Sequence, residues 1–164
     1  MNQSPLIRPA CPEDLPRIKE IALRAWEPIY AGYQDRMGDE LFSLLWPAGW
    51  EEAKANEIAD HFQRYPEQCL VTELDGRIVG FITFVLKRKQ KIGEIGNNAV
   101  DPDYQGRGIG VAQYRHVLQL FRKHGMAYAE VGTGLDEAHA PARAAYEKVG
   151  FTLMIPIGRY YRKL

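Results

Sequence analysis

The sequence predicts a mixed α+β fold, and three features of its pattern favour this class. Residues 12–66 are mostly helical in character, with Leu15, Ile18 and Ala22 at helical spacing. From Cys69 onward, short runs rich in β-branched and aromatic residues are typical of strands. In the second half a strand, a helix and another strand follow one another, which is the order of a parallel crossover.

Length and charge balance limit the possible functions. The chain has 164 residues, which suits one domain over residues 1–164. Lys plus Arg and Asp plus Glu each number 21, so the formal net charge is zero and gives no general attraction to nucleic acid or anionic membrane. No apolar run approaches the ~20 residues needed to span a bilayer. We therefore expect a domain that binds neither nucleic acid nor membrane.

The two cysteines, Cys11 and Cys69, are too few for a disulfide framework, and no Cys/His cluster has the spacing of a zinc site. The first residues also lack the basic-then-apolar pattern of a signal peptide. These features predict unpaired thiols, no bound metal and a cytoplasmic location.

The first half is expected to contain one strand and several helical segments. Residues 6–8 are apolar enough for a first strand, and Pro12, followed by two acidic residues, is typical of a helix start. Residues 26–66 are rich in aromatic side chains, which suit either a core layer or the wall of a substrate pocket. The helical pattern in this stretch is expected to break at Gly32, Gly38, Pro47 and Gly49.

The second half predicts a hairpin followed by a crossover. Asp75 and Gly76 separate two apolar runs and tolerate the positive φ of a type I′ turn, so residues 69–74 and 77–86 are expected to pair. A basic turn at 87–91 leads into the next strand. The remaining elements are expected as a strand at 92–100, a helix ending at Gly125, a strand at 127–133, a helix at 140–149, and closing strands near 151–155 and 159–162.

A glycine-rich turn, Gln105-Gly-Arg-Gly-Ile-Gly110, joins the strand ending at Val100 to the following helix. Its glycines let a ligand approach the backbone closely. The first amides of a helix lack acceptors within the helix, and with the helix dipole they favour an anion such as a pyrophosphate. Arg107 is expected to add a charge-assisted contact. A tight strand-to-helix turn without a ligand is the alternative.

The spacing of these glycines fits neither of the common nucleotide-binding motifs. The third glycine of a dinucleotide fingerprint would fall at Val111 or Gln113, and the Gly-Lys-Ser/Thr of a P-loop is missing. Instead, Gln105-x-x-Gly108-x-Gly110 after Val100-x-Pro102 resembles the acyl-CoA pyrophosphate loop of the GNAT superfamily of N-acetyltransferases.

A second block supports the same resemblance. Ala142-x-x-x-Tyr146-Glu-Lys-Val-Gly150-Phe151 resembles the C-terminal helix of the family and the strand that follows it, at the expected distance from the first block. The resemblance implies a central mixed, mostly antiparallel sheet flanked by helices. It also implies direct transfer of the acetyl group of acetyl-CoA to a primary amine within a ternary complex, without a metal.

The resemblance further assigns the co-substrate site to the strand end, the glycine loop and the last helix. The residues expected to bind acetyl-CoA are Ala99, Val100, Gln105, Gly106, Arg107, Gly108, Ile109, Gly110 and His139. In the family, backbone amides at the Val100 position face the thioester carbonyl, where they stabilise developing negative charge. Many members carry asparagine at position 139. Histidine can still donate a hydrogen bond there, or it is a helix-start residue without a functional role.

Two catalytic side chains are expected, Tyr146 as general acid and Glu94 as general base. Tyr146 matches a tyrosine that GNAT members often keep near the sulfur, where a phenol can protonate the departing thiolate; a core tyrosine is the alternative. Glu94 shares a strand with Val100, and strand alternation over six residues predicts that both side chains lie on one face. A bulge would break that relation. Glu130 is the second candidate for the base.

The acceptor is expected to be a small-molecule or protein amine, and a homodimer is possible. Pocket residues are expected within 26–33 and 134–139. The competing function is a catalytically idle CoA-binding sensor, which would keep the glycine loop but need no acid or base. A nucleic-acid-binding role for residues 87–91 is disfavoured by the zero net charge and by the lack of a known reader motif.

Overall fold

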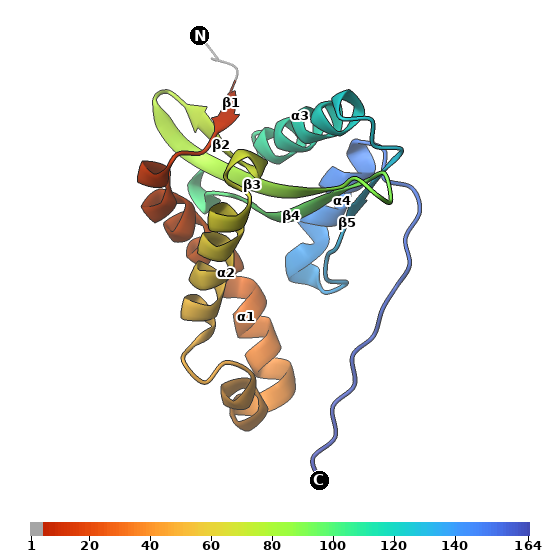
Figure 1. The fold of residues 1–164 in the computed structure, drawn as a ribbon. Coiled ribbons are helices and arrows are strands. Elements are labelled where there is room, and N and C mark those ends of the chain that lie inside the picture. The colour runs from red at the N-terminus through yellow and green to blue at the C-terminus, as the bar shows by residue number, and fades with distance from the viewer. Residues whose placement is uncertain (1–4) are drawn as a thin grey trace.

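A computed structural model describes residues 5–164, and Figure 1 shows how its helices and strands are arranged. Short 3₁₀ turns precede α1, β2, α3 and α4. In chain order the main elements are β1 (Leu6–Pro9), α1 (Leu15–Leu45), α2 (Trp50–Arg64), β2 (Cys69–Leu74), β3 (Arg77–Lys87), β4 (Ile92–Val100), α3 (Ile109–Lys123), β5 (Tyr128–Val131) and α4 (Ala140–Lys148).

The strands form one mixed, mostly antiparallel sheet in the order β1-β2-β3-β4-β5, as predicted. Neighbours pair antiparallel except β4 and β5, which are parallel and joined through α3. The predicted hairpin turn is confirmed, because Asp75 and Gly76 both have positive φ, at 50° and 73°. The parallel pair places the end of β4 beside the start of α3.

Helices cover both faces of this sheet and bury two apolar clusters. On one face α1 and α2 pack against the sheet through residues such as Ile18, Ile58 and Phe81. On the other face α3 and α4 pack through residues such as Ile82, Val117 and Tyr146. Figure 1 shows α3 on one side of the sheet and α1 and α2 on the other. Among residues 5–164, no helix is both long enough and apolar enough to cross a bilayer.

The predicted breaks in the first helical region are partly confirmed. At Gly38 the backbone leaves the helical region, with φ 76° and ψ 161°, so α1 is kinked there. Pro47 and Gly49 lie in the turn between α1 and α2, and Gly49 takes φ 94°. Gly32 is different, because α1 continues through it; a glycine lowers helix propensity but does not forbid the helix.

The two closing strands predicted near 151–155 and 159–162 do not form. After Phe151 the chain has no regular secondary structure and runs away from the sheet, past α1 (Figure 1). The prediction rested on the apolar and aromatic residues of this segment, which favour extended backbone. A strand also needs a neighbouring strand edge, and the segment does not return to β5.

Both cysteines are free thiols, as expected. Cys69 is fully buried in the α1–α2 cluster, and burial raises the pKa of its thiol to about 12. The Cys11 thiol lies 3.2 Å from Asp14 Oδ2, and this hydrogen bond raises its pKa.

Candidate active site

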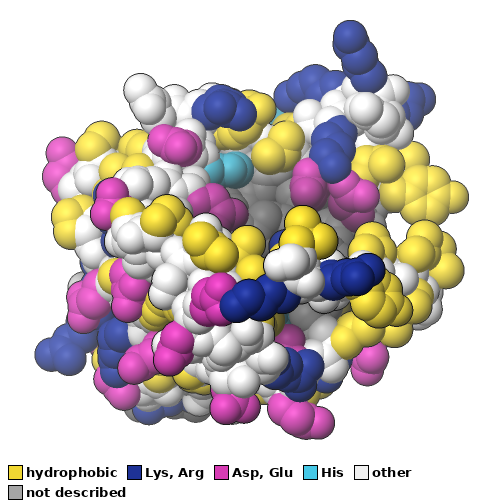
Figure 2. Space-filling model, turned by 90° about the horizontal axis from the view of Figure 1, so that it is seen from below, with side chains coloured by type: hydrophobic (Ala, Val, Ile, Leu, Met, Phe, Trp, Pro, Cys, Tyr) yellow, Lys and Arg dark blue, Asp and Glu magenta, His cyan; other side chains and the backbone are white. Residues whose placement is uncertain are grey.

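One large cleft, of about 1070 Å³, opens where the end of β4 meets α1, α2, α3 and α4. Seen from below, the molecule is hollowed on this side, with acidic side chains and a histidine at the rim (Figure 2). Most of the predicted site residues line the cleft: Glu94, Ala99, Val100, Gln105, Gly106, Gly108, Ile109, Gly110, His139 and Tyr146. Strand ends, helix starts and one helix face therefore converge on a single space.

The edge of β4 that faces away from β3 is the central feature of this cleft. β4 pairs with β5 only as far as Ile95, which lies opposite Val131. Residues 96–100 continue along β3 but have no strand partner on the other side within the described chain. Because the two parallel strands separate there, the backbone of β4 faces the cleft with unpaired groups.

The ladder with β3 shows which amides face the open edge. Asp101 donates its N–H to Val79 across the β3–β4 ladder, at 2.8 Å. Bonded and non-bonded positions alternate in an antiparallel ladder, so Ala99 is also directed at β3, whereas the amides of Val100 and Asn98 point to the opposite edge. Val100 is thus placed as the family resemblance implies. The amide of Asn98 also faces the open edge, whereas the amide of Ala99 is directed at β3.

A bulge in β4 overturns the expectation that Glu94 and Val100 share a face. The pairing with β3 shifts between Ile82 and Phe84, where β4 carries one extra residue. Accordingly Ile95 lies in the cluster under α3 and α4, whereas Ala99, an even number of residues later, lies in the cluster under α1 and α2. The side chains of Glu94 and Val100 therefore lie on opposite faces of β4.

The glycine loop is shaped as an anion site. Gly106 and Gly108 have φ values of 77° and 78°, and no atom lies within 4 Å of the position that a Cβ would take on either. Gly108 is the N-cap of α3, so the first amides of that helix are available at the surface of the cleft. The space over the two glycines and the helix dipole suit a pyrophosphate.

Buried charge holds this loop against α1. Asp101 is 1% exposed and accepts a hydrogen bond from Asp103 N at 3.0 Å, which caps the turn before the loop. Its carboxylate also binds Arg17, and Arg24 at 2.7 Å. Burial opposes the charged form, but the Asp103 amide and the two guanidiniums outweigh it and lower the pKa of Asp101.

The side chains of Gln105 and Arg107 make different contacts, and only Gln105 lines the cleft. The Gln105 side chain donates to the Val100 carbonyl at 3.1 Å and so joins the loop to the strand end. Arg107 does not line the cleft. Its guanidinium lies 5.0 Å from the ring centroid of Tyr104 and donates to the Asp103 carbonyl at 3.2 Å. In this arrangement the Arg107 side chain contacts the loop itself, and its expected contact with a phosphate stays a prediction.

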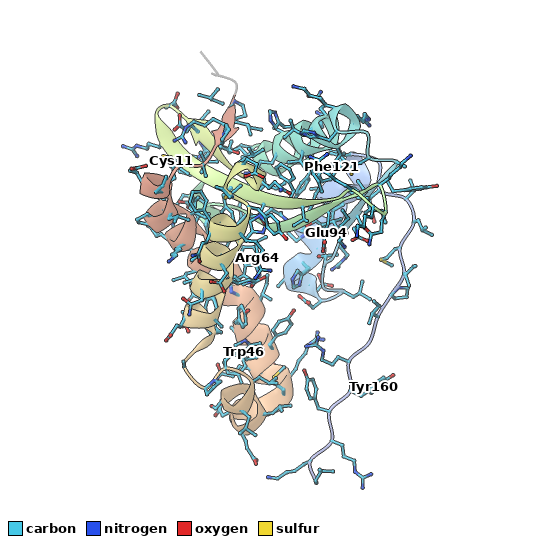
Figure 3. All side chains as sticks on the ribbon, in the orientation of Figure 1. Cys11, Trp46, Arg64, Glu94, Phe121 and Tyr160 are labelled. Carbon is cyan, nitrogen blue, oxygen red and sulfur yellow. The ribbon has the colours of Figure 1, made fainter. Side chains whose placement is uncertain are left out.

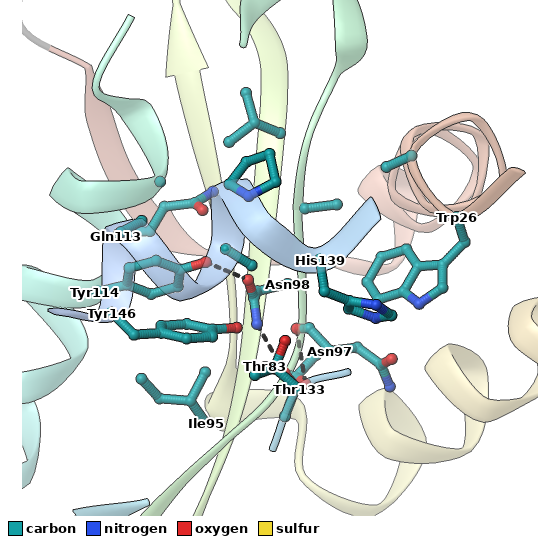
Figure 4. A pocket seen from close by; sticks show the side chains of 18 of the residues that line it. Trp26, Thr83, Ile95, Asn97, Asn98, Gln113, Tyr114, Thr133, His139 and Tyr146 are labelled. Carbon is teal, nitrogen blue, oxygen red and sulfur yellow. Dashed lines mark hydrogen bonds between the residues drawn. The ribbon is translucent and has the colours of Figure 1, made fainter. Parts of the chain in front are cut away.

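Tyr146 belongs to the core and to the cleft at once. It is 6% exposed, and its ring packs against Tyr114 and Phe151 at centroid distances of 4.8 and 5.9 Å. Figure 4 shows its hydroxyl directed toward β4, near Asn98 and Thr83. The hydroxyl of Tyr114 is already used, since it donates to Asn98 Oδ1 at 2.6 Å.

His139 lies on the opposite side of the cleft from Tyr146 and next to Trp26 (Figure 4). Its Nδ1 is 2.8 Å from Asp136 Oδ2, which orients the ring and leaves Nε2 for a ligand. Gly134 lies under the ring, where a Cβ would approach Nδ1 to 2.4 Å. The His139 side chain is therefore held against residues 134–136 by packing and by a hydrogen bond.

The two candidate bases flank one lysine. Lys87 Nζ lies 2.7 Å from Glu94 and also binds Glu130. Glu94 lines the cleft, whereas Glu130 does not. The contact between Lys87 and Glu94 is half-exposed, and Figure 3 shows Glu94 on the sheet.

A polar cluster on α2 was not predicted from the sequence. Lys54, 7% exposed, donates to Glu57 at 2.6 Å and to Asn97 at 3.0 Å, and lies 4.7 Å from the Trp26 ring centroid. Asn97 in turn donates to Glu57 at 2.9 Å. Burial raises the pKa of Glu57, but these hydrogen bonds outweigh it and lower the pKa overall. The only signal in the sequence was a pair of asparagines inside an apolar strand.

The family comparison agrees with this geometry. Residues 36–151 match the family described as "Acetyltransferase (GNAT) family". The chain belongs to the GNAT family. GNAT enzymes use acetyl-CoA as their co-substrate, and the open β4 edge and glycine loop fit such a molecule. Within residues 5–164, no group of three or more His, Cys, Asp or Glu side chains is arranged to hold a metal ion.

Two relatives of similar sequence are also named as N-acetyltransferases. N-alpha-acetyltransferase RimI of Mycobacterium tuberculosis is 44% identical over 69 residues, covering 42% of this chain and 40% of that protein. An uncharacterized N-acetyltransferase of Methanocaldococcus jannaschii is 31% identical over 94 residues, covering 54% and 41%. The chain thus spans about two fifths of the length of these curated relatives.

Solved structures show the same GNAT fold over nearly the whole chain. PaiA N-acetyltransferase of Thermoplasma acidophilum, in complex with coenzyme A, has a TM-score of 0.75 at 20% identity and covers 95% of this chain and 94% of that one. The ribosomal-protein-S18-alanine N-acetyltransferase of Escherichia coli has a TM-score of 0.66 at 22% identity, with 93% and 80% covered. The predicted fold class is confirmed.

Proposed function

We propose that this chain is an acetyl-CoA-dependent N-acetyltransferase that acetylates a primary amine by direct transfer within a ternary complex. The observation that carries the proposal is the unpaired edge of β4, which opens into the cleft between the glycine loop and Tyr146. An amide row facing a pocket can hold an extended thioester-bearing arm, and the positive end of α3 can hold its pyrophosphate.

The proposed reaction joins the amine nitrogen to the acetyl carbon and breaks the carbon–sulfur bond. The amide of Val100, directed at the open edge, would donate to the oxygen of the tetrahedral intermediate. The hydroxyl of Tyr146 would give its proton to the departing thiolate. Holding both reactants in one cleft replaces a slow encounter in solution by a positioned one.

Glu94 is proposed to take the proton from the amine, directly or through water. It is the candidate base that lines the cleft, and its carboxylate lies on the face of β4 that α1 and α2 cover. Glu57 and Asp60 line the same cleft together with Arg24 and Arg64, so charges of both signs surround the space in which the amine would lie. His139 Nε2 is proposed to contact acetyl-CoA.

The acceptor is proposed to be a small-molecule amine or a protein amine. By their names, RimI of Mycobacterium tuberculosis acts on an α-amine and the Escherichia coli protein on an alanine of ribosomal protein bS18. An accessible amine on a flexible chain end would fit an open cleft of this size. We also propose a cytoplasmic location, supported by the two free thiols, and a homodimer.

Calorimetric titration with acetyl-CoA, CoA, NAD and ATP tests the co-substrate site. We expect micromolar binding of acetyl-CoA and CoA but not of NAD or ATP, and a loss of about 100-fold or more in Gly108→Glu, since a side chain there fills the anion site. Gly125→Glu is the matched control. Gly125 also has a positive φ, 73°, at the other end of α3, so it shares the backbone strain without touching the cleft.

A screen of amines then separates an enzyme from an idle CoA-binding module. Release of CoA with one class of amine would support the transferase. Tight CoA binding without turnover on small amines or on peptide N-termini would favour the sensor instead. Failure of the folded protein to bind either CoA species would overturn the proposal.

A further inference from the structure

A stripe of charged side chains on α2 has no part in the reaction steps proposed above. Its members line the cleft at helical spacing: Glu57, Asp60, His61 and Arg64. Residues three, four and seven positions apart share one face of an α-helix. Glu57 and Arg64 are therefore two turns apart, about 10 Å along the helix axis, and place opposite charges on the same wall of the cleft.

At one end of this stripe, two donors hold the carboxylate of Glu57. Lys54 Nζ donates to one oxygen at 2.6 Å, and Asn97 Nδ2 donates to the other at 2.9 Å. Figure 4 shows the Asn97 side chain directed toward α2. Burial raises the pKa of Glu57, but these contacts lower it overall, so the group stays ionised near neutral pH. The side chain is 55% exposed, and its remaining lone pairs can accept from an ammonium group in the cleft.

At the other end, the guanidinium of Arg64 has no partner. It is exposed and lines the cleft, and no ion pair or side-chain hydrogen bond in the described part of the chain includes it. Arg17 and Arg24, by contrast, both bind the carboxylate of Asp101. Figure 3 shows Arg64 at the end of α2, near the sheet. A guanidinium presents a planar fork of N–H donors that matches a carboxylate, so Arg64 is suited to an anionic group of a ligand.

The rest of the wall in this part of the cleft is largely apolar. Trp26 and Ile29 on α1, Val85 on β3 and Tyr65 after α2 line it. In pockets of this kind the apolar surface accepts a carbon chain, and a few polar groups fix its orientation. A simple alkylamine would leave Arg64 without a partner, and a diamine would place a second cation against it. A ligand with an amine at one end and an anion at the other satisfies both ends of the stripe.

We propose that the acceptor is an ω-amino carboxylate, whose ammonium group is bound by Glu57 and whose carboxylate is bound by Arg64. This inference rests on the proposed transferase function and names the class of its acceptor; Glu94 remains the proposed base. Because the two binding groups are two helical turns apart, the amine and the carboxylate are separated by several bonds, which excludes the short spacing of an α-amino acid.

Kinetics with matched acceptors test the class. Release of CoA is measured with an ω-amino carboxylate and with the alkylamine and the diamine of the same chain length. We expect kcat/KM for the amino carboxylate to exceed both others by about 10-fold or more, because charge-assisted hydrogen bonds to the carboxylate form only there. Lengthening the chain from the α-amino acid should raise kcat/KM until the two ends span the stripe.

Variants of Arg64 identify the group that binds the carboxylate. Arg64→Gln should lower the ratio of kcat/KM between the amino carboxylate and the alkylamine by about 10-fold or more. Arg64→Glu should reverse the preference, so that the diamine becomes the better substrate, a gain that an unfolded variant could not produce. Arg77→Gln is the matched control, because Arg77 is an exposed arginine on β3 that does not line the cleft, and it should leave the ratio unchanged.

The ammonium end is tested with Glu57→Gln, which should raise KM for all three amines, since each carries the same cationic group. Calorimetric titration of the CoA-bound protein with the amino carboxylate gives a second readout that needs no turnover. Equal kcat/KM for the amino carboxylate and the alkylamine, a ratio unaffected by Arg64→Gln, or neither binding nor turnover of the amino carboxylate would each overturn the inference. Loss of the proposed function itself is recognised separately, because acetyl-CoA would then fail to bind.

Discussion

At the scale of the residue, Tyr146 separates packing from chemistry. Its ring fills the core between Tyr114 and Phe151, whereas its hydroxyl is directed to the cleft. Its packing and its proposed role as general acid rest on different atoms of one side chain. Removing only the oxygen therefore leaves the core filled and tests the hydroxyl alone.

Tyr146→Phe should lower kcat by about 10²-fold or more, the usual contribution of a positioned general acid. The dissociation constant for acetyl-CoA should stay within about twofold, because the ring still packs as before. Steady-state kinetics and calorimetry measure the two quantities. Tyr160→Phe is the matched control, since it removes the same oxygen from a 96% exposed side chain outside the cleft. An unchanged kcat in Tyr146→Phe would exclude the acid role.

Glu94 and Glu130 offer a controlled test of the base, because both bind Lys87 but only Glu94 lines the cleft. Glu94→Gln should lower kcat/KM for the amine by about 10²-fold at neutral pH and flatten the acid side of the rate profile. Glu130→Gln should change either quantity little. Equal losses in both variants would assign the effect to Lys87, and a larger loss in Glu130→Gln would exchange the two roles.

At the scale of the element, a charged cluster joins β1, β2 and the start of α1. Arg8 on β1 donates to Asp14 at 2.7 and 3.1 Å, and to Glu73 on β2 at 2.6 Å. Asp14 also accepts from the Cys11 amide at 2.9 Å and is 7% exposed. The hydrogen bond from Arg8, against the opposing effect of burial, lowers the pKa of Asp14 to about 2.

This cluster predicts how stability changes in acid. The folded pKa of Asp14 lies below its value of about 3.9 in an unfolded chain. Its contribution is therefore complete above pH ~4 and is lost as the pH falls toward ~2. We expect ionised Asp14 to contribute about 1–2 kcal/mol to the free energy of unfolding, because Arg8 is one-third exposed and solvent screens the pair. Urea unfolding from pH 2 to pH 6 measures it.

Asp14→Asn should lower stability near neutral pH and remove this part of the acid loss. Asp35→Asn, at an exposed position of α1, should leave the profile unchanged. A wild-type profile that is already flat between pH 4 and pH 2 would contradict the assignment.

The elements and the site differ in how far the sequence could predict them. Periodicity and turn residues located the helices and the five strands of the sheet, because both signals are local. The glycine loop that begins at Gln105 could be predicted from its motif, because a phosphate loop needs its glycines in one contiguous stretch. A bulge in β4 was named only as an alternative, and the cluster of Lys54, Glu57 and Asn97 was missed. Each depends on how α2 and β3 meet β4, which no local pattern encodes.

At the scale of the whole molecule, the segment after Phe151 is the largest difference between the predicted and the observed fold. The strands expected at 151–155 and 159–162 need a sheet edge to pair with, and this segment does not return to β5. Which edge a strand pairs with is set by the path of the whole chain, and no local pattern encodes it.

The state of the two thiols has a practical consequence for enzymology. Burial raises the pKa of the Cys69 thiol to about 12, so this thiol stays protonated and inaccessible near neutral pH. Colorimetric disulfide reagents react with thiolates, and the coenzyme A released in each turnover carries an accessible thiol. The proposed acetyl transfer can therefore be followed continuously by absorbance, with the buried Cys69 thiol adding little background colour.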